Sequence, residues 1–347
     1  MNYDTTMKTY YSCLAAAPYY FAAAPYYFAA TPYYFAAALL ALAVAPCSSA
    51  AADGAWPPEN FRGVLDLSTR HVLTEGDYSV VNHIGYDARY VFSNDSGDIG
   101  TLLVQPFIQL ASGSSEFDDE LQWRMTNFNF TGFGRVNVRV GHFELPFGLE
   151  QVIPTNGEVR QVQNSAALGL VNDWGISLNG SLPSVEYEVG FLRGGGNSIS
   201  TDANGYFVGR VATPSERRFW IGLSGFAGEL ETSAGPQEQL RAGIDLGWRL
   251  PKGYSILAEF ATGENDGDNV DFALAELDWT NLREQLDLYL QYRYEDAASD
   301  VSSKFVGGAR YALNNHMSLS AQVELETANP VITTGNEIVT VQFRYRW

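Results

Sequence analysis

From Asn60 onward the chain is a series of segments, each about ten residues long, in which apolar and polar residues alternate. In one of them, Leu288 and Leu290 fall on one face and Gln291 falls on the other. Side chains alternate between the faces of a β-strand, and about ten residues of strand cross a bilayer. A soluble β-sandwich also alternates, but with shorter strands and less consistently charged polar faces. The pattern therefore predicts an all-β protein, a transmembrane antiparallel β-barrel.

Residues rich in Gly, Asn, Asp, Ser and Pro separate the alternating segments and serve as turn signals. They give sixteen strands as the preferred count, or fourteen if two weak segments are misassigned. The predicted strands are 61–73, 81–93, 99–111, 120–131, 134–143, 173–181, 184–193, 205–213, 217–229, 239–250, 254–263, 270–280, 284–295, 303–313, 317–327 and 336–347.

The last segment, 337–347, ends abruptly on the aromatic Trp347. This ending resembles the terminal strand of bacterial outer-membrane barrels, which implies that the strand finishes on the periplasmic side. Counting backward then predicts short periplasmic turns and longer external loops, as such barrels have. The turns are 94–98, 132–133, 182–183, 214–216, 251–253, 281–283 and 314–316; the loops are 74–80, 112–119, 144–172, 194–204, 230–238, 264–269, 296–302 and 328–335.

The first fifty-two residues have the features of an export signal. A short apolar stretch at 36–45 is followed by small residues, with a predicted cleavage after Ala50 or Ala52. A seven-residue A-P-Y-Y-F-type repeat lies before it. We therefore predict a signal peptide over 1–52 and a barrel over 53–347. Both cysteines, Cys13 and Cys47, lie in the signal, so the mature barrel would contain neither a disulfide nor a thiol.

Composition supports an exported barrel and argues against other classes. The mean hydropathy of −0.13 is too polar for a helical membrane protein, but it suits strands that are apolar only at every second residue. The formal charge of −19 argues against a nucleic-acid partner. The expected partners are outer-membrane lipid, lipopolysaccharide with its divalent cations, and small hydrophilic solutes or ions.

The segment 139–150, R-V-G-H-F-E-L-P-F-G-L-E, resembles the phosphate-selective porin O/P family. The stretches 174–180 and 187–191 resemble the strand pair that follows it in that family. The resemblance implies a bacterial outer-membrane porin of sixteen strands, assembled as a homotrimer. It also implies that the third extracellular loop, 144–172, folds toward the lumen and narrows the pore.

Strand parity and the long loop together give the candidates for pore lining and constriction. These are Arg89, Arg135, Arg139, Arg241, Arg293, Arg310, Arg344, Glu144, Glu150, Glu158, Asp245 and Asp287. The family relies on arginine ladders and lysine clusters, whereas this chain has only Lys8, Lys252 and Lys304, and its predicted lumen mixes both signs.

The mixed lumen favours a passive diffusion channel for ions and small hydrophilic solutes. An anion- or phosphate-selective porin is the alternative within the same class. A sealed structural or adhesive barrel is the alternative of another class. An outer-membrane enzyme is least favoured, because the chain has four histidines and neither a G-x-S-x-G nor an H-E-x-x-H motif. No cofactor or metal site is predicted.

Overall fold

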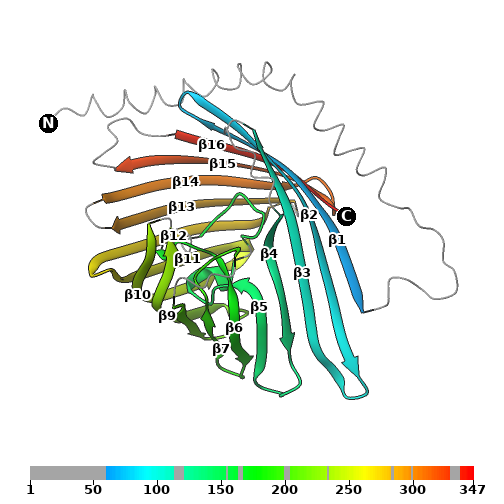
Figure 1. Cartoon of the computed structure of the whole chain (residues 1–347). Coiled ribbons are helices and arrows are strands. Elements are labelled where there is room, and N and C mark those ends of the chain that lie inside the picture. Colours follow the sequence, from blue (N-terminus) through cyan, green and yellow to red (C-terminus); the bar gives the residue numbers. More distant parts are fainter. Residues whose placement is uncertain are drawn as a thin grey trace. The chain divides into compact units, whose positions relative to one another are not determined.

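The computed structural model describes residues 60–112, 121–153, 155–162, 167–198, 204–232, 234–282, 285–297, 300–328 and 337–347. Within them, sixteen strands form one closed antiparallel barrel in which each strand pairs with its neighbours in sequence (Figure 1). This confirms the predicted fold class and strand count. The predicted signal peptide, 1–52, lies outside the described residues.

The strands follow the predicted order without exception. They are Phe61–Thr74 (β1), Asp77–Asn94 (β2), Gly97–Ser112 (β3), Leu121–Phe130 (β4), Asn137–Glu144 (β5), Asn172–Ser181 (β6), Glu186–Leu192 (β7), Tyr206–Ala212 (β8), Phe219–Thr232 (β9), Gly235–Arg249 (β10), Tyr254–Asn265 (β11), Asp268–Leu282 (β12), Leu286–Ala297 (β13), Asp300–Ala312 (β14), Met317–Ala328 (β15) and Glu337–Arg346 (β16).

The barrel closes where its first strand pairs with its last. β1 and β16 run in register from Asp66 opposite Arg346 to Leu73 opposite Val339. The terminal residue extends this ladder, because Trp347 donates its backbone N–H to the carbonyl of Leu65 at 2.9 Å. Closure pairs the two strands that would be the free edges of an open sheet, and such pairing is the condition for a β-structure to stand in lipid.

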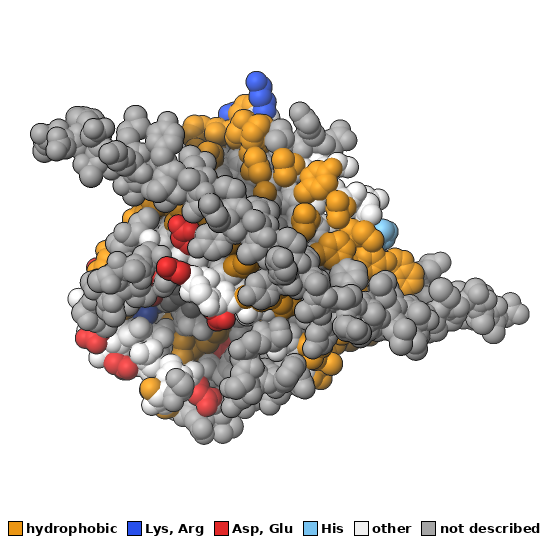
Figure 2. Space-filling model, turned by 90° about the horizontal axis from the view of Figure 1, so that it is seen from above, with side chains coloured by type: hydrophobic (Ala, Val, Ile, Leu, Met, Phe, Trp, Pro, Cys, Tyr) orange, Lys and Arg blue, Asp and Glu red, His pale blue; other side chains and the backbone are white. Residues whose placement is uncertain are grey.

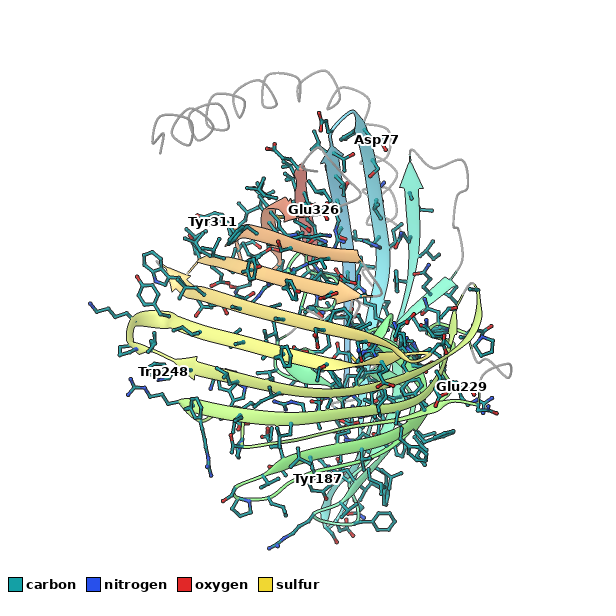
Figure 3. All side chains as sticks on the ribbon, turned by 90° about the vertical axis from the view of Figure 1, so that its left-hand side faces the viewer. Asp77, Tyr187, Glu229, Trp248, Tyr311 and Glu326 are labelled. Carbon is teal, nitrogen blue, oxygen red and sulfur yellow. The ribbon has the colours of Figure 1, made fainter. Side chains whose placement is uncertain are left out.

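The two faces of the wall differ as the alternation predicts. Large apolar side chains lie exposed on the outer face, such as Leu223, which is 62% exposed, and Leu290, which is 55% exposed. Polar residues such as Gln291, which is fully buried, face inward. Figure 2 shows hydrophobic side chains gathered on the flank of the barrel, and Figure 3 shows Trp248 at one end of the strands and Glu229 at the other.

Several predicted external loops are wrong, because the strands extend further than the alternation indicated. Between β11 and β12 only Asp266 and Gly267 remain, with φ values of 49° and 91° that are typical of a two-residue hairpin turn. The strand bounds likewise leave only two residues between strands in three other places, 75–76, 233–234 and 298–299. The predicted loops there were 74–80, 230–238 and 296–302. The predicted contrast between short turns and long loops is therefore weaker than expected.

The longest connection is 145–171, between β5 and β6, and we call it the inner segment. It includes a short 3-10 helix, Gly148–Gln151 (η1). A second 3-10 helix, Pro251–Gly253 (η2), makes the turn before β11. Among the described residues, no helix has the length and apolarity to cross a membrane.

Candidate functional site in the barrel interior

The inner segment begins by passing from β5 onto the inward faces of β9 and β11. Gly148 donates its backbone N–H to Oγ of Ser224 at 3.0 Å, and Leu149 donates to Oε2 of Glu259 at 2.9 Å. Gly148 has a φ of 57°, and a side chain there would overlap the Glu259 carboxylate. Glycine is therefore required for this close approach of the backbone to β11.

Two apolar clusters hold the inner segment against the wall, and each combines residues of the segment with inward residues of the strands. In the first, Leu145, Phe147, Ala167 and Leu168 pack with wall residues that include Tyr206, Phe226, Ala261 and Phe272. In the second, Leu149, Ile153 and Val162 pack with Trp220, Leu257 and Leu274. Burying one such large side chain contributes about 1.5–3 kcal/mol, so the clusters favour a docked segment.

Glu150 of η1 is a buried carboxyl group, only 4% exposed, and it accepts a hydrogen bond from the hydroxyl of Thr155. Burial raises the pKa of Glu150 to about 8, and the neighbouring carboxylates of Glu144 and Glu259 act in the same direction, while the Thr155 hydrogen bond opposes them. Glu150 is therefore mainly protonated at neutral pH, which reduces the cost of burying it.

Arg160 fixes the middle of the inner segment to β12. Its Nη2 lies 2.7 Å from Oδ2 of Asp278, and it also forms an ion pair with Glu276. Its guanidinium lies 5.5 Å from the ring centroid of Tyr289. Burial alone would lower the pKa of Arg160, but the two carboxylates outweigh it and raise that pKa. The arginine remains charged and compensates two buried acids on the wall.

Glu158 connects the inner segment to the other side of the barrel. Its carboxylate lies 2.7 Å from Nη1 of Arg344 on β16 and 3.7 Å from Nε of Arg310 on β14. Arg344 in turn pairs with Asp66 of β1 at 2.5 Å, and Arg124 of β4 also pairs with Asp66. The inner segment therefore makes charged contacts with β12 and also with the β14–β16 side.

The predicted site residues fall into one group around Glu158 and several separate pairs. Arg310, Arg344 and Glu158 belong to the group, and Asp287 joins it through Arg310 at 3.7 Å. Arg310 is the most open of the group, with 42% of its side chain exposed. This group therefore combines opposed charges, not a ladder of one sign.

Three other predicted arginines serve local contacts. Arg139 pairs with Glu188 at 3.1 Å. Arg241 is buried and donates to the main-chain carbonyl of Ala167 at 3.0 Å, and Arg293 donates to that of Gln161 at 2.9 Å. The latter two arginines thus hold the backbone of the inner segment.

Among the remaining candidates, Asp245 pairs with Arg210 at 2.6 Å, and Glu144 ends β5 beside a cavity described below. Arg89 is exposed on β2, five residues before that strand ends. The prediction for Arg135 as a strand residue facing the lumen is wrong. Because β5 begins only at Asn137, Arg135 lies exposed in the turn 131–136.

Sequence reasoning omitted Asp66, Arg70, Arg124 and Arg160 from the candidates. Strand parity could have found Asp66 and Arg70, which alternate with apolar residues on β1. Arg124 was hidden by a β-bulge, because the register of β3 and β4 shifts between Val104 and Pro106. Arg160 lies in a loop, where no periodicity indicates a direction. Among the described residues, no group of three or more His, Cys, Asp or Glu side chains could hold a metal ion.

No protein-family model matches the sequence, and no curated protein sequence matches it. Solved structures do. The anion-selective porin from Comamonas acidovorans superposes with a TM-score of 0.61 at 13% identity, over 83% of this chain and 99% of that one. A loop-deletion mutant of OmpT, an outer membrane protein of Vibrio cholerae, superposes with a TM-score of 0.63 at 11% identity, over 83% of this chain and 99% of that one.

A triple mutant of the Rhodopseudomonas blastica porin gives a TM-score of 0.58 at 12% identity, over 83% of this chain and all of that one. Likeness at such low identity is likeness of fold. The chain thus has the fold of the bacterial outer-membrane porins, a closed barrel of sixteen strands.

Proposed function

We propose that the protein is an outer-membrane porin, a passive diffusion channel for ions and small hydrophilic solutes. The observation that carries this proposal is the interior of the barrel. Arg310 and Asp287 face inward with 42% and 39% of their side chains exposed, next to the inner segment. A charged, open inner wall inside an apolar outer wall is suited to water in the lumen and lipid outside.

The inner segment is proposed to narrow this channel. Its clusters and ion pairs hold it against the inward faces of the strands from β8 to β16. A barrel of this strand number is wide enough to leave an aqueous path, and only material inside the barrel reduces that path to the size of a metabolite. The proposed constriction lies around Glu158, Arg310 and Arg344.

An anion-selective porin is the second candidate. Arg70, Arg124, Arg310 and Arg344 all contact Asp66 or Glu158, so cations outnumber acids in this part of the interior. Rings of one sign select ions of the other. An observation against anion selectivity is that β12 contributes the acids Glu276 and Asp278, which are paired with only one arginine, Arg160. A weak preference is expected, not strict selection.

Planar-bilayer recording tests the proposal. The full chain should produce large, stable conductance steps, and a sealed barrel that produced none would contradict it. Reversal potential in a salt gradient then separates the two candidates, since a strong anion potential would favour the second. Cross-linking in membranes tests the proposed homotrimer. The proposed location is the outer membrane, with the Trp347 end of the barrel in the periplasm.

A further inference from the structure

A partly enclosed cavity of about 380 Å³ lies where β4 and β5 separate, and the inner segment forms part of its lining. β4 pairs with β3 as far as Leu121, but its pairing with β5 stops at Thr126 opposite His142. The volume is within the range of pockets that hold small ligands.

Three residues around this cavity carry buried polar atoms that have no hydrogen-bond partner within the described part of the chain. The atoms are Nε of Arg70, both ring nitrogens of His142 and Oδ1 of Asn172. His142 is only 1% exposed, and its ring lies beside the backbone of Arg124 and Gly196 without a hydrogen bond of ordinary geometry. An unpaired buried polar atom is costly, so their concentration around one cavity points to a ligand that supplies the partners.

The charged groups that line the cavity are compensated within the protein. Arg124 and Glu158 each have an ion-pair partner on a wall strand. Arg70 faces the charge of Glu158, and Glu144 faces that of Arg139. Among the described lining residues the two signs balance, so a net charge on the ligand brings no advantage, and a neutral ligand fits best.

The rest of the lining combines amide side chains with aromatic surface. The amides are those of Gln109, Asn156, Gln161 and Asn197, and the rings are those of Phe107 and Trp123. A saccharide carries hydroxyl groups around its edge and C–H groups on its faces. Each hydroxyl both donates and accepts, so it pairs equally well with a guanidinium N–H, with either tautomer of an imidazole and with an amide oxygen.

We propose that this cavity is a binding site for a small neutral saccharide, of one or two sugar rings. Its hydroxyl groups supply the hydrogen-bond partners of Arg70, His142 and Asn172, and its apolar face packs on the rings of Phe107 and Trp123. This inference rests on the proposed function, because it names a solute class for the same interior.

Other small occupants match the cavity less well. Water pairs with the polar atoms but leaves the aromatic rings uncovered. A carboxylate only accepts hydrogen bonds and has no donor for Oδ1 of Asn172, whereas an ammonium only donates and has no acceptor for Nε of Arg70. A saccharide satisfies both atoms and covers the rings, and this is the basis for choosing it.

Calorimetric titration of the full chain tests the site without requiring conductance. The chain is folded in micelles of a detergent that has no sugar headgroup. The neutral probes are D-glucose, D-galactose and maltose, and the charged probes are D-glucuronate and D-glucosamine. At least one neutral sugar should bind, at least about threefold more tightly than either charged probe. Absence of binding by all three neutral sugars would overturn the proposal, and tighter binding of a charged probe would overturn it in favour of an ionic site.

Variants locate the binding. Arg70→Lys keeps the positive charge beside Glu158 but removes Nε, and His142→Phe keeps a ring but removes both nitrogens. Each should weaken sugar binding by about two- to tenfold, the range for one hydrogen bond. The matched controls are Arg62→Lys, at an exposed position on the strand of Arg70, and His316→Phe, in the exposed turn before β15. Both controls should bind as the parent does.

Unchanged binding in both cavity variants, or an equal loss in the controls, would overturn the site. Circular dichroism checks that each variant forms a barrel, and if His142→Phe does not fold, Arg70→Lys decides. Binding without conductance steps would count against the porin function alone, and conductance steps without sugar binding against this inference alone.

Discussion

Arg160 of the inner segment donates its Nε–H to Oε2 of Glu276 on β12 at 3.1 Å, across 116 residues of sequence. This contact joins the loop after the fifth strand to a wall strand far along the chain. It holds the inner segment inside the barrel together with the two apolar clusters and the ion pairs of Glu158.

Replacing Arg160 with Met should loosen the inner segment. The change leaves Glu276 and Asp278 uncompensated, and removing one partner of a buried ion pair costs about 3–5 kcal/mol. Cleavage of the segment by a non-specific protease in micelles should accelerate. Arg217→Met, in the exposed turn after β8, is the control. Adding Glu276→Gln to Arg160→Met should restore part of the protection, and unchanged cleavage in the single variant would show that the pair does not hold the segment.

Leu149→Ala should weaken docking of the same segment through packing. Leu149 is fully buried against Trp220 and the cluster around it, and a large-to-small change at such a position costs about 2–5 kcal/mol. Hydrogen exchange of the amides in η1 should speed up accordingly. Leu290→Ala removes an equal side chain from the outer face and should leave this exchange unchanged. Similar effects of the two variants would argue against a docked segment.

The docking should also depend on pH through Glu150. Its pKa is raised from 4.5 in the unfolded chain to about 8 in the folded one, so the folded state binds more protons between these values. Stability is therefore fully present below about pH 4.5 and falls as pH rises toward about pH 8, by at most about 1.4 kcal/mol per pH unit. Protection of η1 against exchange, corrected for intrinsic rates, should follow this slope. Glu150→Gln should flatten it, and an equal slope in that variant would assign the effect to another group.

Charge changes around Glu158 should alter ion preference in opposite directions. Glu158→Gln removes the acid between Arg344 and Arg310 and should shift the reversal potential toward anion preference. Arg310→Gln removes an open cation and should shift it toward cation preference. The two variants serve as controls for each other, since a change in pore size alone would not give shifts of opposite sign.

The sequence predicts the wall far better than the interior. Alternation repeats along every strand, so the pattern predicts all sixteen strands even though each segment alone is a weak signal. The same alternation predicts that residues such as Arg344 and Asp245 face inward. Strand ends were less predictable, because hairpins such as 266–267 need only two residues and polar strand ends resemble loops.

The inner segment shows where pattern reasoning stops. Its length identified it as a long loop, and Glu158 was among the predicted pore-lining residues. The neighbouring sequence does not predict that Arg160 contacts Glu276 or that Gly148 lies against Glu259. Such contacts depend on where a loop without periodicity crosses the barrel. The cavity at Arg70 and Glu144 arises likewise from the divergence of β4 and β5, a feature of pairing that alternation does not encode.

Cysteine modification tests most directly whether the interior conducts. Arg310 and Tyr311 are neighbours on β14 with similar exposure on opposite faces, and the predicted mature barrel has no cysteine of its own. Single-channel recordings would compare Arg310→Cys and Tyr311→Cys before and after a bulky charged thiol reagent. The account predicts a clear fall in conductance for Arg310→Cys and none for Tyr311→Cys. Equal responses of the two variants, or a barrel that never conducts, would contradict it.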